Sequence, residues 1–358
     1  MKSKLQIDLR LLAPVAILIA ISLVTLLSVN VAYFKSQLTA LVVGIIAFLF
    51  FSKTNIEFMK QLKLPIYIIS LVLLGIVLFI GIETRGASRW IDILGVRLQF
   101  SEILKPFLAL AFAALIEEER NINFKSFLKT VIYIIPVVIL IAIQPDLGSG
   151  LLYAGAGAFA LFVLGFPLLW FGAVLLPFIL TSPLIWSILH GYQRQRILTF
   201  INANPDPLGS SYNGIQAIIA VGSGGFMGKG ISEGTQSVLR FLPERHTDFI
   251  FATIAEGLGF VGSSIVILAF MLLAYRVYVL FRESDGLFSK AFLAVSFGFL
   301  IIQGFVNIAM NMGILPIVGI TFPFVSFGGS SLLSNFIFLG MISSIAGNSR
   351  NKDVLEIR

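Results

Sequence analysis

The junction Arg240-Phe241-Leu242-Pro243-Glu244-Arg245-His246-Thr247-Asp248 leads directly into an apolar run that extends to about residue 275. Charged and titratable side chains crowd the first part, and the second is long enough to cross a bilayer, which takes about 17–25 apolar residues. Burying ionised groups is costly unless they pair or stay hydrated. Asp248 taken alone could simply cap the next helix, because acidic side chains favour a helix N-terminus. The junction as a whole indicates a membrane protein with charged groups held at a membrane boundary.

Composition supports this interpretation. The chain has 358 residues, of which 58% are hydrophobic and 12% are charged, whereas a soluble domain averages about 45–50% apolar and about 25% charged residues. Cysteine is absent and histidine occurs only at positions 190 and 246, which excludes disulfides, thiolate sites and a His-rich zinc site. The net charge of +7 does not indicate nucleic-acid binding, because basic residues in such chains flank the membrane spans. The first apolar run lacks a small-residue cleavage site, so we expect it to remain as the first span.

The predicted fold is an all-α integral membrane protein that forms one polytopic domain over residues 1–358. A long extracytoplasmic loop, about 191–248, separates the seventh and eighth predicted transmembrane helices. A loop of this length in a compact protein is usually functional or disordered. The apolar runs predict about ten helices, at about 11–29, 37–52, 64–82, 102–116, 129–144, 147–165, 167–190, 249–275, 288–312 and 320–346.

Basic residues give the orientation. With both termini in the cytoplasm, every inner segment of appreciable length carries lysine or arginine, as the positive-inside rule requires. Nine further basic residues gather in two outer segments, where they call for an anionic partner. These are Arg85, Arg89, Arg97 and Lys105 in the first, and Arg194, Arg196, Lys229, Arg240 and Arg245 in the second.

The segment 83–105 is the first candidate site. Trp90 alone is typical of an interfacial anchor. Glu102 and Lys105 lie three residues apart on one face of the next helix and can pair, and Pro106 fits its first turn. An ionisable pair entering a membrane span is a functional hypothesis; the structural alternative is that each residue only neutralises the other.

Polar residues in later segments extend this candidate site. Asp146 lies within a helix stop made by Pro145 and Gly148, and it either is a hydrated loop carboxylate or faces the same cavity. Glu256 lies eight residues after Asp248, so a continuous helix would let the two share a broad polar face. A stripe at 303, 307 and 311 suits helix-to-helix hydrogen bonding as well as a substrate path.

Two glycine-rich stretches interrupt the apolar pattern. Gly222–Gly230 has the wrong spacing for a phosphate-binding P-loop, and the preceding residues 215–221 could lie along the membrane interface or re-enter it. Gly319–Ser331 breaks the last apolar region near its outer end, where irregular backbone must be buried in protein or line a hydrated cavity. A half-helix starting near Ser330 would present free N–H groups to an anion.

Several of these motifs resemble the SEDS family (shape, elongation, division and sporulation), and the likeness covers nearly the whole chain. Two departures are visible: Phe100 stands where the family usually has Pro, and Phe327 stands where it usually has Tyr. The matching stretches are Gly86–Ile91 (GASRWI), Ser101–Lys105 (SEILK), Gln144–Gly148 (QPDLG), Leu242–Ala252 (LPERHTDFIFA) and Pro323–Ser331 (PFVSFGGSS).

The resemblance implies ten membrane helices and an enzyme that polymerises lipid II into glycan strands at the outer face of the bacterial cytoplasmic membrane. It is closest to the branch of the family that serves cell elongation and shape, and the division branch is the alternative with the same chemistry. By motif position Asp248 is the essential carboxylate, and we expect it to act as general base. The other expected substrate-binding residues are Arg89, Trp90, Glu102, Lys105, Asp146, Arg194, Arg196, Arg240, Arg245, His246, Ser326 and Ser330.

The resemblance also implies partners and leaves alternatives open. Expected partners are lipid II, the nascent glycan strand, a class B penicillin-binding protein (a transpeptidase) and the elongation machinery, with no nucleic acid. A divalent cation, Mg²⁺ or Mn²⁺, bridging Asp248 to pyrophosphate is compatible with the chemistry, although the sequence shows no metal-ligand cluster. The alternatives are a flippase for the lipid-linked precursor, against which no internal repeat is visible, and a scaffold, which would leave the outer charges without a role.

Overall fold

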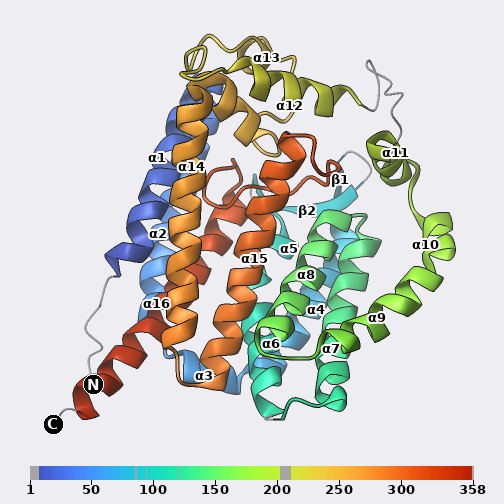
Figure 1. Ribbon diagram of the computed structural model, residues 1–358, viewed down its shortest axis with the longest axis vertical. Coiled ribbons are helices and arrows are strands. Elements are labelled where there is room, and N and C mark those ends of the chain that lie inside the picture. Colours follow the sequence, from blue (N-terminus) through green and yellow to red (C-terminus); the bar gives the residue numbers. More distant parts are fainter. Residues whose placement is uncertain (1–7, 85–86, 94, 120, 202–210, 357–358) are drawn as a thin grey trace.

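The computed structural model describes residues 8–84, 87–93, 95–119, 121–201 and 211–356. In this part the chain is an all-α integral membrane protein with one small sheet (Figure 1). The apolar helices are α1 (Leu9–Val29), α2 (Val31–Lys53), α4 (Lys63–Ile80), α6 (Lys105–Glu118), α7 (Phe124–Ile143), α8 (Leu147–Val163), α9 (Leu168–Leu180), α14 (Ile250–Glu283), α15 (Leu287–Asn311) and α16 (Gly329–Glu356).

Each of the ten predicted apolar runs overlaps one of these helices. Among the described helices, seven are long and apolar enough to cross a membrane: α1, α2, α4, α7, α14, α15 and α16 as far as Gly347. Helices α8 and α9 are shorter apolar helices, and α6 continues from the short α5 (Phe100–Ile103) with Pro106 in its first turn. α1 begins and α16 ends at the same end of the bundle (Figure 1), which is the arrangement that two cytoplasmic termini require.

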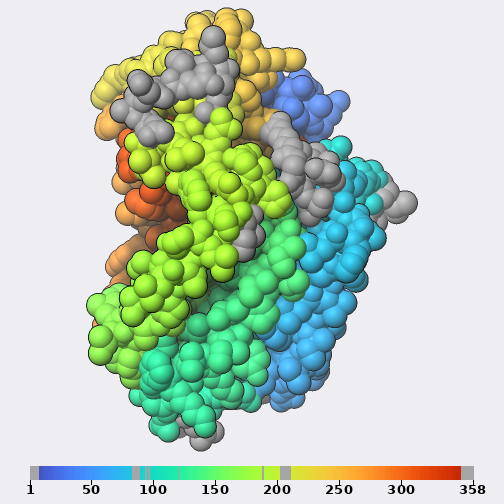
Figure 2. Space-filling view, turned by 90° about the vertical axis from the view of Figure 1, so that its right-hand side faces the viewer, coloured from blue at the N-terminus to red at the C-terminus, as the bar shows by residue number. Residues whose placement is uncertain are grey.

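The bundle is organised around α15. This helix packs against α6 and α8 on one side and α14 on the other, while α2 pairs with α16 and α1 pairs with α14. An ion pair ties the start of α1 to α14, where Arg276 donates to Asp8 Oδ2 from Nε at 2.8 Å and from Nη2 at 2.6 Å. Helix α9, by contrast, buries none of its side chains. It continues through α10 (Ser182–Ile188) and α11 (Gly191–Ile201) as a band across one face of the molecule (Figure 2).

A small antiparallel sheet was not predicted. It consists of β1 (Ile82–Thr84), β2 (Ala87–Ile93) and β3 (Val96–Leu98), with Ile82 opposite Trp90 and Ile91 opposite Leu98. The turn between β2 and β3 is closed by the Gly95 N–H, which donates to Asp92 Oδ1 at 2.7 Å, and Gly95 has φ +83°. The strands are only three to seven residues long, too short for a clear alternating pattern.

Three predicted segments differ in detail. The seventh run is split at Thr181 into α9 and α10, and the loop 191–248 contains α11, α12 (Tyr212–Ser223) and α13 (Thr235–Val238). The last run is irregular over 320–328, and its helix starts at Gly329, as the prediction of a half-helix near Ser330 required. The short helix α3 (Ile56–Gln61) connects α2 to α4.

The predicted shared face of Asp248 and Glu256 is wrong. Helix α14 begins after Asp248, and it is interrupted at Gly259, whose φ of +65° and ψ of −159° are not helical. Asp248 is therefore not part of the helix that carries Glu256, and the Glu256 side chain binds the segment around α13 instead. Its carboxylate is fully buried and accepts from Gln236 N at 2.8 Å and from Ser237 N at 2.9 Å.

The close pairing of α2 with α16 gives a stability test. A Cβ added at Gly340 would lie 2.8 Å from Phe51 Cβ and 2.9 Å from Phe48 O, whereas a Cβ at Gly75 in α4 would meet nothing within 4 Å. We expect Gly340→Ala to lower the thermal unfolding temperature of the purified protein, since overpacking costs about 1–3 kcal/mol. Gly75→Ala is the matched control and should raise stability by about 0.5–1 kcal/mol. Equal effects of the two substitutions would contradict the α2–α16 packing.

Candidate active site

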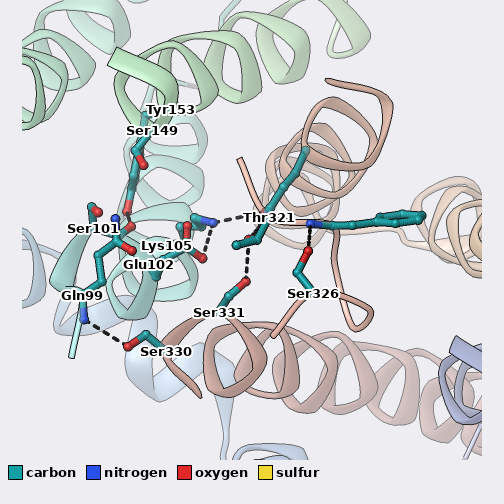
Figure 3. Close-up of polar contacts among 12 residues, drawn as sticks. Gln99, Ser101, Glu102, Lys105, Ser149, Tyr153, Thr321, Ser326, Ser330 and Ser331 are labelled. Carbon is teal, nitrogen blue, oxygen red and sulfur yellow. Dashed lines mark hydrogen bonds and ion pairs between the residues drawn. The ribbon is translucent and has the colours of Figure 1, made fainter. Parts of the chain in front are cut away.

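Residues 312–328, between α15 and α16, are irregular and form one side of the candidate site; we call them the floor segment. It is joined to the segment 242–249 by two hydrogen bonds: the Phe327 N–H donates to His246 O at 2.8 Å, and Ser326 Oγ donates to Thr247 O at 2.7 Å. Ser326 Oγ also accepts from Phe322 N at 2.7 Å (Figure 3). The charged segment before α14 and the irregular segment before α16 therefore form one structural unit. Ser326 joins them, because its hydroxyl bonds to both segments.

Asp248 lies half-buried at the edge of this unit. Its carbonyl oxygen accepts from Asn307 Nδ2 at 3.0 Å and from Asn311 Nδ2 at 2.9 Å. A Cβ added at Gly319 would lie 3.4 Å from Asp248 Oδ2 and 3.9 Å from Arg196 Nη1. The carboxylate of Asp248 and the guanidinium of Arg196 thus border the same point of the backbone, where Gly319 has φ +73° and carries no side chain.

Two arginines lie on the segment that leads to Asp248. Arg240 is exposed and has φ +65°, whereas Arg245 is half-buried and its Nε makes no hydrogen bond. Burial of the Arg245 guanidinium, followed by repulsion from Arg240, lowers the pKa of Arg245 from its usual value. Two cations that repel one another close to a hydrated surface form a site that an anion would stabilise.

His246 contributes an aromatic contact. Its ring stacks on Tyr33 of α2 with the centroids 4.1 Å apart and the planes 6° apart, and the ring of Phe327 lies 5.1 Å from Tyr33 and 5.5 Å from His246. Phe327 therefore fills, with a bare ring, the position where the resemblance led us to expect tyrosine. Tyr33 could not be found from the sequence, because its role depends on tertiary packing alone.

Arg89 and Asp146 form a second polar group. Arg89 Nη1 lies 3.4 Å from Asp146 Oδ1, and Asp146 Oδ2 accepts from Gln99 Nε2 at 3.0 Å. Asp146 is 2% exposed and caps α8 through Ser149, so it is not a hydrated loop carboxylate. The Gln99 N–H donates to Ser330 Oγ at 3.0 Å (Figure 3), which links this group to the start of α16. Trp90 is next to Arg89 in strand β2 and is partly exposed.

Lys105 starts a third polar group inside the bundle. Its Nζ donates to Glu102 Oε2 at 2.7 Å and to Gln303 Oε1 at 3.1 Å, and only 2% of Lys105 is exposed. Gln303 Nε2 in turn donates to Thr321 Oγ1 at 2.8 Å, and Thr321 Oγ1 lies 3.0 Å from Ser331 Oγ (Figure 3). The predicted Glu102–Lys105 pair is present, and a chain of side-chain hydrogen bonds connects it to the floor segment.

Helix α11 carries Arg194 and Arg196 toward the same region. Tyr192 fixes this helix, because its hydroxyl donates to Pro145 O at 2.8 Å next to Asp146. Burial raises the pKa of Tyr192, which keeps this donor protonated. Arg194 Nη2 donates to Ser187 O at 2.7 Å, whereas Arg196 is exposed with its guanidinium 5.7 Å from the Tyr192 ring centroid.

The structure thus brings together most of the predicted residues in three connected groups. Arg85 lies outside the described residues, and Lys229 lies apart from the groups, beside Glu256 at 3.6 Å. The sequence did not single out Tyr33, Gln99, Tyr192 or Thr321, which are ordinary polar residues that gain a role only from their neighbours. In the described part of the chain, no three acidic or histidine side chains gather as a metal site. A cation beside Asp248 would thus need substrate oxygens as further ligands.

Comparisons with known proteins agree with this arrangement. A family model described as "Cell cycle protein", which groups FtsW, RodA and SpoVE, matches residues 4–351. The chain is 41% identical over 284 residues to the peptidoglycan glycosyltransferase MrdB of Escherichia coli K12, covering 78% of this chain and 76% of that protein. It is 34% identical over 328 residues to the probable peptidoglycan glycosyltransferase FtsW of Trichlorobacter lovleyi, covering 88% and 84%.

Two solved structures share the fold. One is a chain from a peptidoglycan synthase complex that coordinates polymerization and crosslinking, with a TM-score of 0.83 and 30% identity over 97% of this chain and 99% of that chain. The other is the rod shape determining protein RodA of Thermus thermophilus, with a TM-score of 0.74 and 28% identity over 97% and 98%. Since the family model spans nearly the whole chain and these relatives align over most of it, the chain belongs to the FtsW, RodA and SpoVE family, the SEDS family that its motifs resemble.

Proposed function

We propose that the chain is a peptidoglycan glycosyltransferase that polymerises lipid II at the outer face of the cytoplasmic membrane during cell elongation. The observation that carries the proposal is the position of the Asp248 carboxylate, which borders Gly319 together with the Arg196 guanidinium and lies on the segment that also carries Arg240 and Arg245. Relatives of this chain are named peptidoglycan glycosyltransferases. Lipid II carries its pyrophosphate at this membrane boundary, where Arg196, Arg240 and Arg245 can neutralise it.

The chemistry requires one base and several cations. The acceptor sugar hydroxyl attacks the anomeric carbon, its C–O bond to the pyrophosphate breaks, and the lipid pyrophosphate leaves with the electron pair. The carboxylate of Asp248 takes the hydroxyl proton, and the arginines stabilise the charge on the leaving group. Inversion from an α-linked pyrophosphate to a β-linked strand follows from a single displacement. Hydrolysis of a glycoside by water would instead use two opposed carboxylates.

The remaining predicted residues take supporting roles in this proposal. Arg89 is exposed enough to meet the substrate, with 28% of its side chain accessible, and its Nε makes no hydrogen bond. Asp146 and Glu102 hold the neighbouring cations, and Ser326 and Ser330 hold the floor segment. His246 and Trp90 offer ring faces at the mouth of the site, a position suited to sugar rings.

The setting of the enzyme follows from the same relatives. The structure that aligns over 97% of this chain belongs to a complex that coordinates polymerization with crosslinking, which supports a transpeptidase, a class B penicillin-binding protein, as the partner. We propose that both termini are cytoplasmic and that the catalytic groups face outward. The flippase alternative shares this topology and differs in its product, so an assay of glycan strands separates the two functions.

The base assignment predicts the outcome of one substitution. Asp248→Asn should reduce glycan ladder formation from labelled lipid II by about 10²–10⁴-fold, the usual contribution of a general base. The change keeps the size of the side chain and leaves the carbonyl bonds to Asn307 and Asn311 in place. Glu233→Gln is the matched control, since Glu233 is an exposed carboxylate in the same outer loop, and it should retain full activity. Near-normal ladders from a well-folded Asp248→Asn protein would sink the assignment.

A double substitution tests the role of Lys105. Lys105→Ala should lower stability and activity, because it leaves Glu102 buried without its cation. Adding Glu102→Gln to Lys105→Met removes both charges at similar volume. A structural pair predicts that stability and polymerase activity recover together, whereas a role in the reaction predicts a stable and inactive protein. We expect the second result, measured by thermal unfolding and by ladder formation on the same preparation.

The orientation can be tested directly, because the chain contains no cysteine. Ser232→Cys places a single thiol on the exposed segment before α13. We expect this thiol to react with a membrane-impermeant maleimide in intact spheroplasts. A cysteine at Ser52, at the inner end of α2, is the matched control and should react only after the membrane is opened. The reverse pattern would invert the topology and remove the substrate from the site.

A further inference from the structure

The glycine-rich segment Gly224–Gly230, which the active site does not use, fits into the break of α14. At the break the helix loses its own hydrogen bonds, and the segment replaces them on both sides. Two of its N–H groups donate to carbonyls before the break, and two of its carbonyls accept N–H groups after it. The bonds are Lys229 N to Glu256 O at 3.0 Å, Gly230 N to Gly257 O at 3.1 Å, Phe260 N to Gly225 O at 2.9 Å and Val261 N to Phe226 O at 3.2 Å.

The glycines are required by this close approach. A Cβ at Gly224 would lie 1.9 Å from Ala255 O, and a Cβ at Gly228 would lie 2.2 Å from Gly257 O. Only backbone without side chains can come this near to α14. The segment therefore packs tightly into the break of α14, and its hydrogen bonds to this helix satisfy four of its own backbone groups.

Two large apolar side chains of this segment point away from the protein. Met227 is 74% exposed and Phe226 is 65% exposed, although the neighbouring backbone is bonded. Phe226 stacks on Phe260 of α14 with the ring centroids 5.9 Å apart, and Phe260 is itself 64% exposed. The three side chains form one apolar tip, Phe226–Met227–Phe260.

This tip continues the lipid-facing side of α14. Beyond Phe260 the exposed apolar residues of this helix follow one side of it, at Ile265, Leu268, Met271, Leu272, Tyr275 and Tyr278. From Phe260 to Tyr278, 18 residues on, the helix extends about 27 Å at about 1.5 Å per residue. The hydrocarbon layer is about 30 Å thick, and tyrosine is enriched at its boundary. Phe260 therefore lies near the outer edge of the hydrocarbon layer, and Phe226 beside it lies at the same depth.

We propose that the tip Phe226–Met227–Phe260 inserts into the outer leaflet, where the acyl chains meet the glycerol groups. Irregular backbone at this depth needs hydrogen-bond partners within the protein for its polar groups. The break of α14 supplies four such hydrogen bonds. A loop that exposes apolar side chains while its backbone is hydrogen-bonded to the protein is suited to anchoring at the membrane interface. Helices α12 and α13 cross the outer end of α14 (Figure 1), so the anchor fixes the height of the loop that carries Arg240 and Asp248. The proposal does not depend on the proposed function.

Spin labelling tests the insertion in the full-length protein, because any introduced cysteine is the only one in the chain. Met227→Cys and Phe226→Cys are labelled with a nitroxide in bilayers without a partner protein. Leu268→Cys, on the lipid-facing side of α14 and 62% exposed, is the lipid control; Ser232→Cys is the aqueous control. The readout is the ratio of collision rates with oxygen, which concentrates in lipid, and with a water-soluble nickel complex.

We expect labels at 226 and 227 to behave like the label of the Leu268→Cys control, with more collisions with oxygen than with the nickel complex. The label at 232 should show the reverse ratio. Met227 makes the test robust, because so exposed a side chain can be replaced without disturbing a core. Labels at 226 and 227 that follow Ser232→Cys would overturn the proposal. Labels that stay aqueous until a transpeptidase is added would also overturn it, since the tip would then be a protein contact.

Discussion

Buried backbone carbonyls that lack helical partners are the constraint on which this structure depends. In a membrane protein each such group must find a donor inside the protein. The asparagines of α15 supply these donors: Asn307 Nδ2 bonds Ile320 O at 2.7 Å as well as Asp248 O, and Asn311 Nδ2 bonds Asp248 O as well as Asn307 O. The polar stripe on α15 therefore supports both the floor segment and the backbone of Asp248.

The same stripe joins the buried Glu102–Lys105 pair to the candidate site. Gln303 contacts Lys105, and the hydrogen bonds continue through Thr321 to the start of α16. A fully bonded polar network inside a bundle is rigid, whereas a partly bonded one is costly. Glu102 and Lys105 thus carry their charges at low cost because they pair, and they hold the floor segment at a fixed distance from α6. Preorganised supports of this kind are what electrostatic catalysis requires.

The sequence allowed much of the fold to be predicted, because hydrophobic runs of membrane length are a strong signal. The Glu102–Lys105 pair was also predicted, since ionisable residues are rare in such runs, and the structure contains it. The roles of Asp248 and Asp146 in the site stay predictions. The break of α14 at Gly259 was missed, as glycine in an apolar run signals a kink only when something fills the gap. The filling segment lies about 30 residues earlier in the chain, and no local pattern reports a contact made at that separation. The sheet at 82–98 was missed because its strands are too short to show periodicity.

The two sides of the candidate site rest on supports of different strength. Asp248 is held through its backbone by two buried asparagines, whereas Arg196 lies on α11, which follows the exposed helices α9 and α10 and is tied to the bundle through Tyr192. The proposed reaction makes different demands on these groups. Asp248, as the proposed base, must meet each acceptor hydroxyl in the same geometry, whereas the arginines must release a pyrophosphate in every cycle. A rigidly held Asp248 carboxylate, facing Arg196 on the lightly packed helix α11, meets both demands.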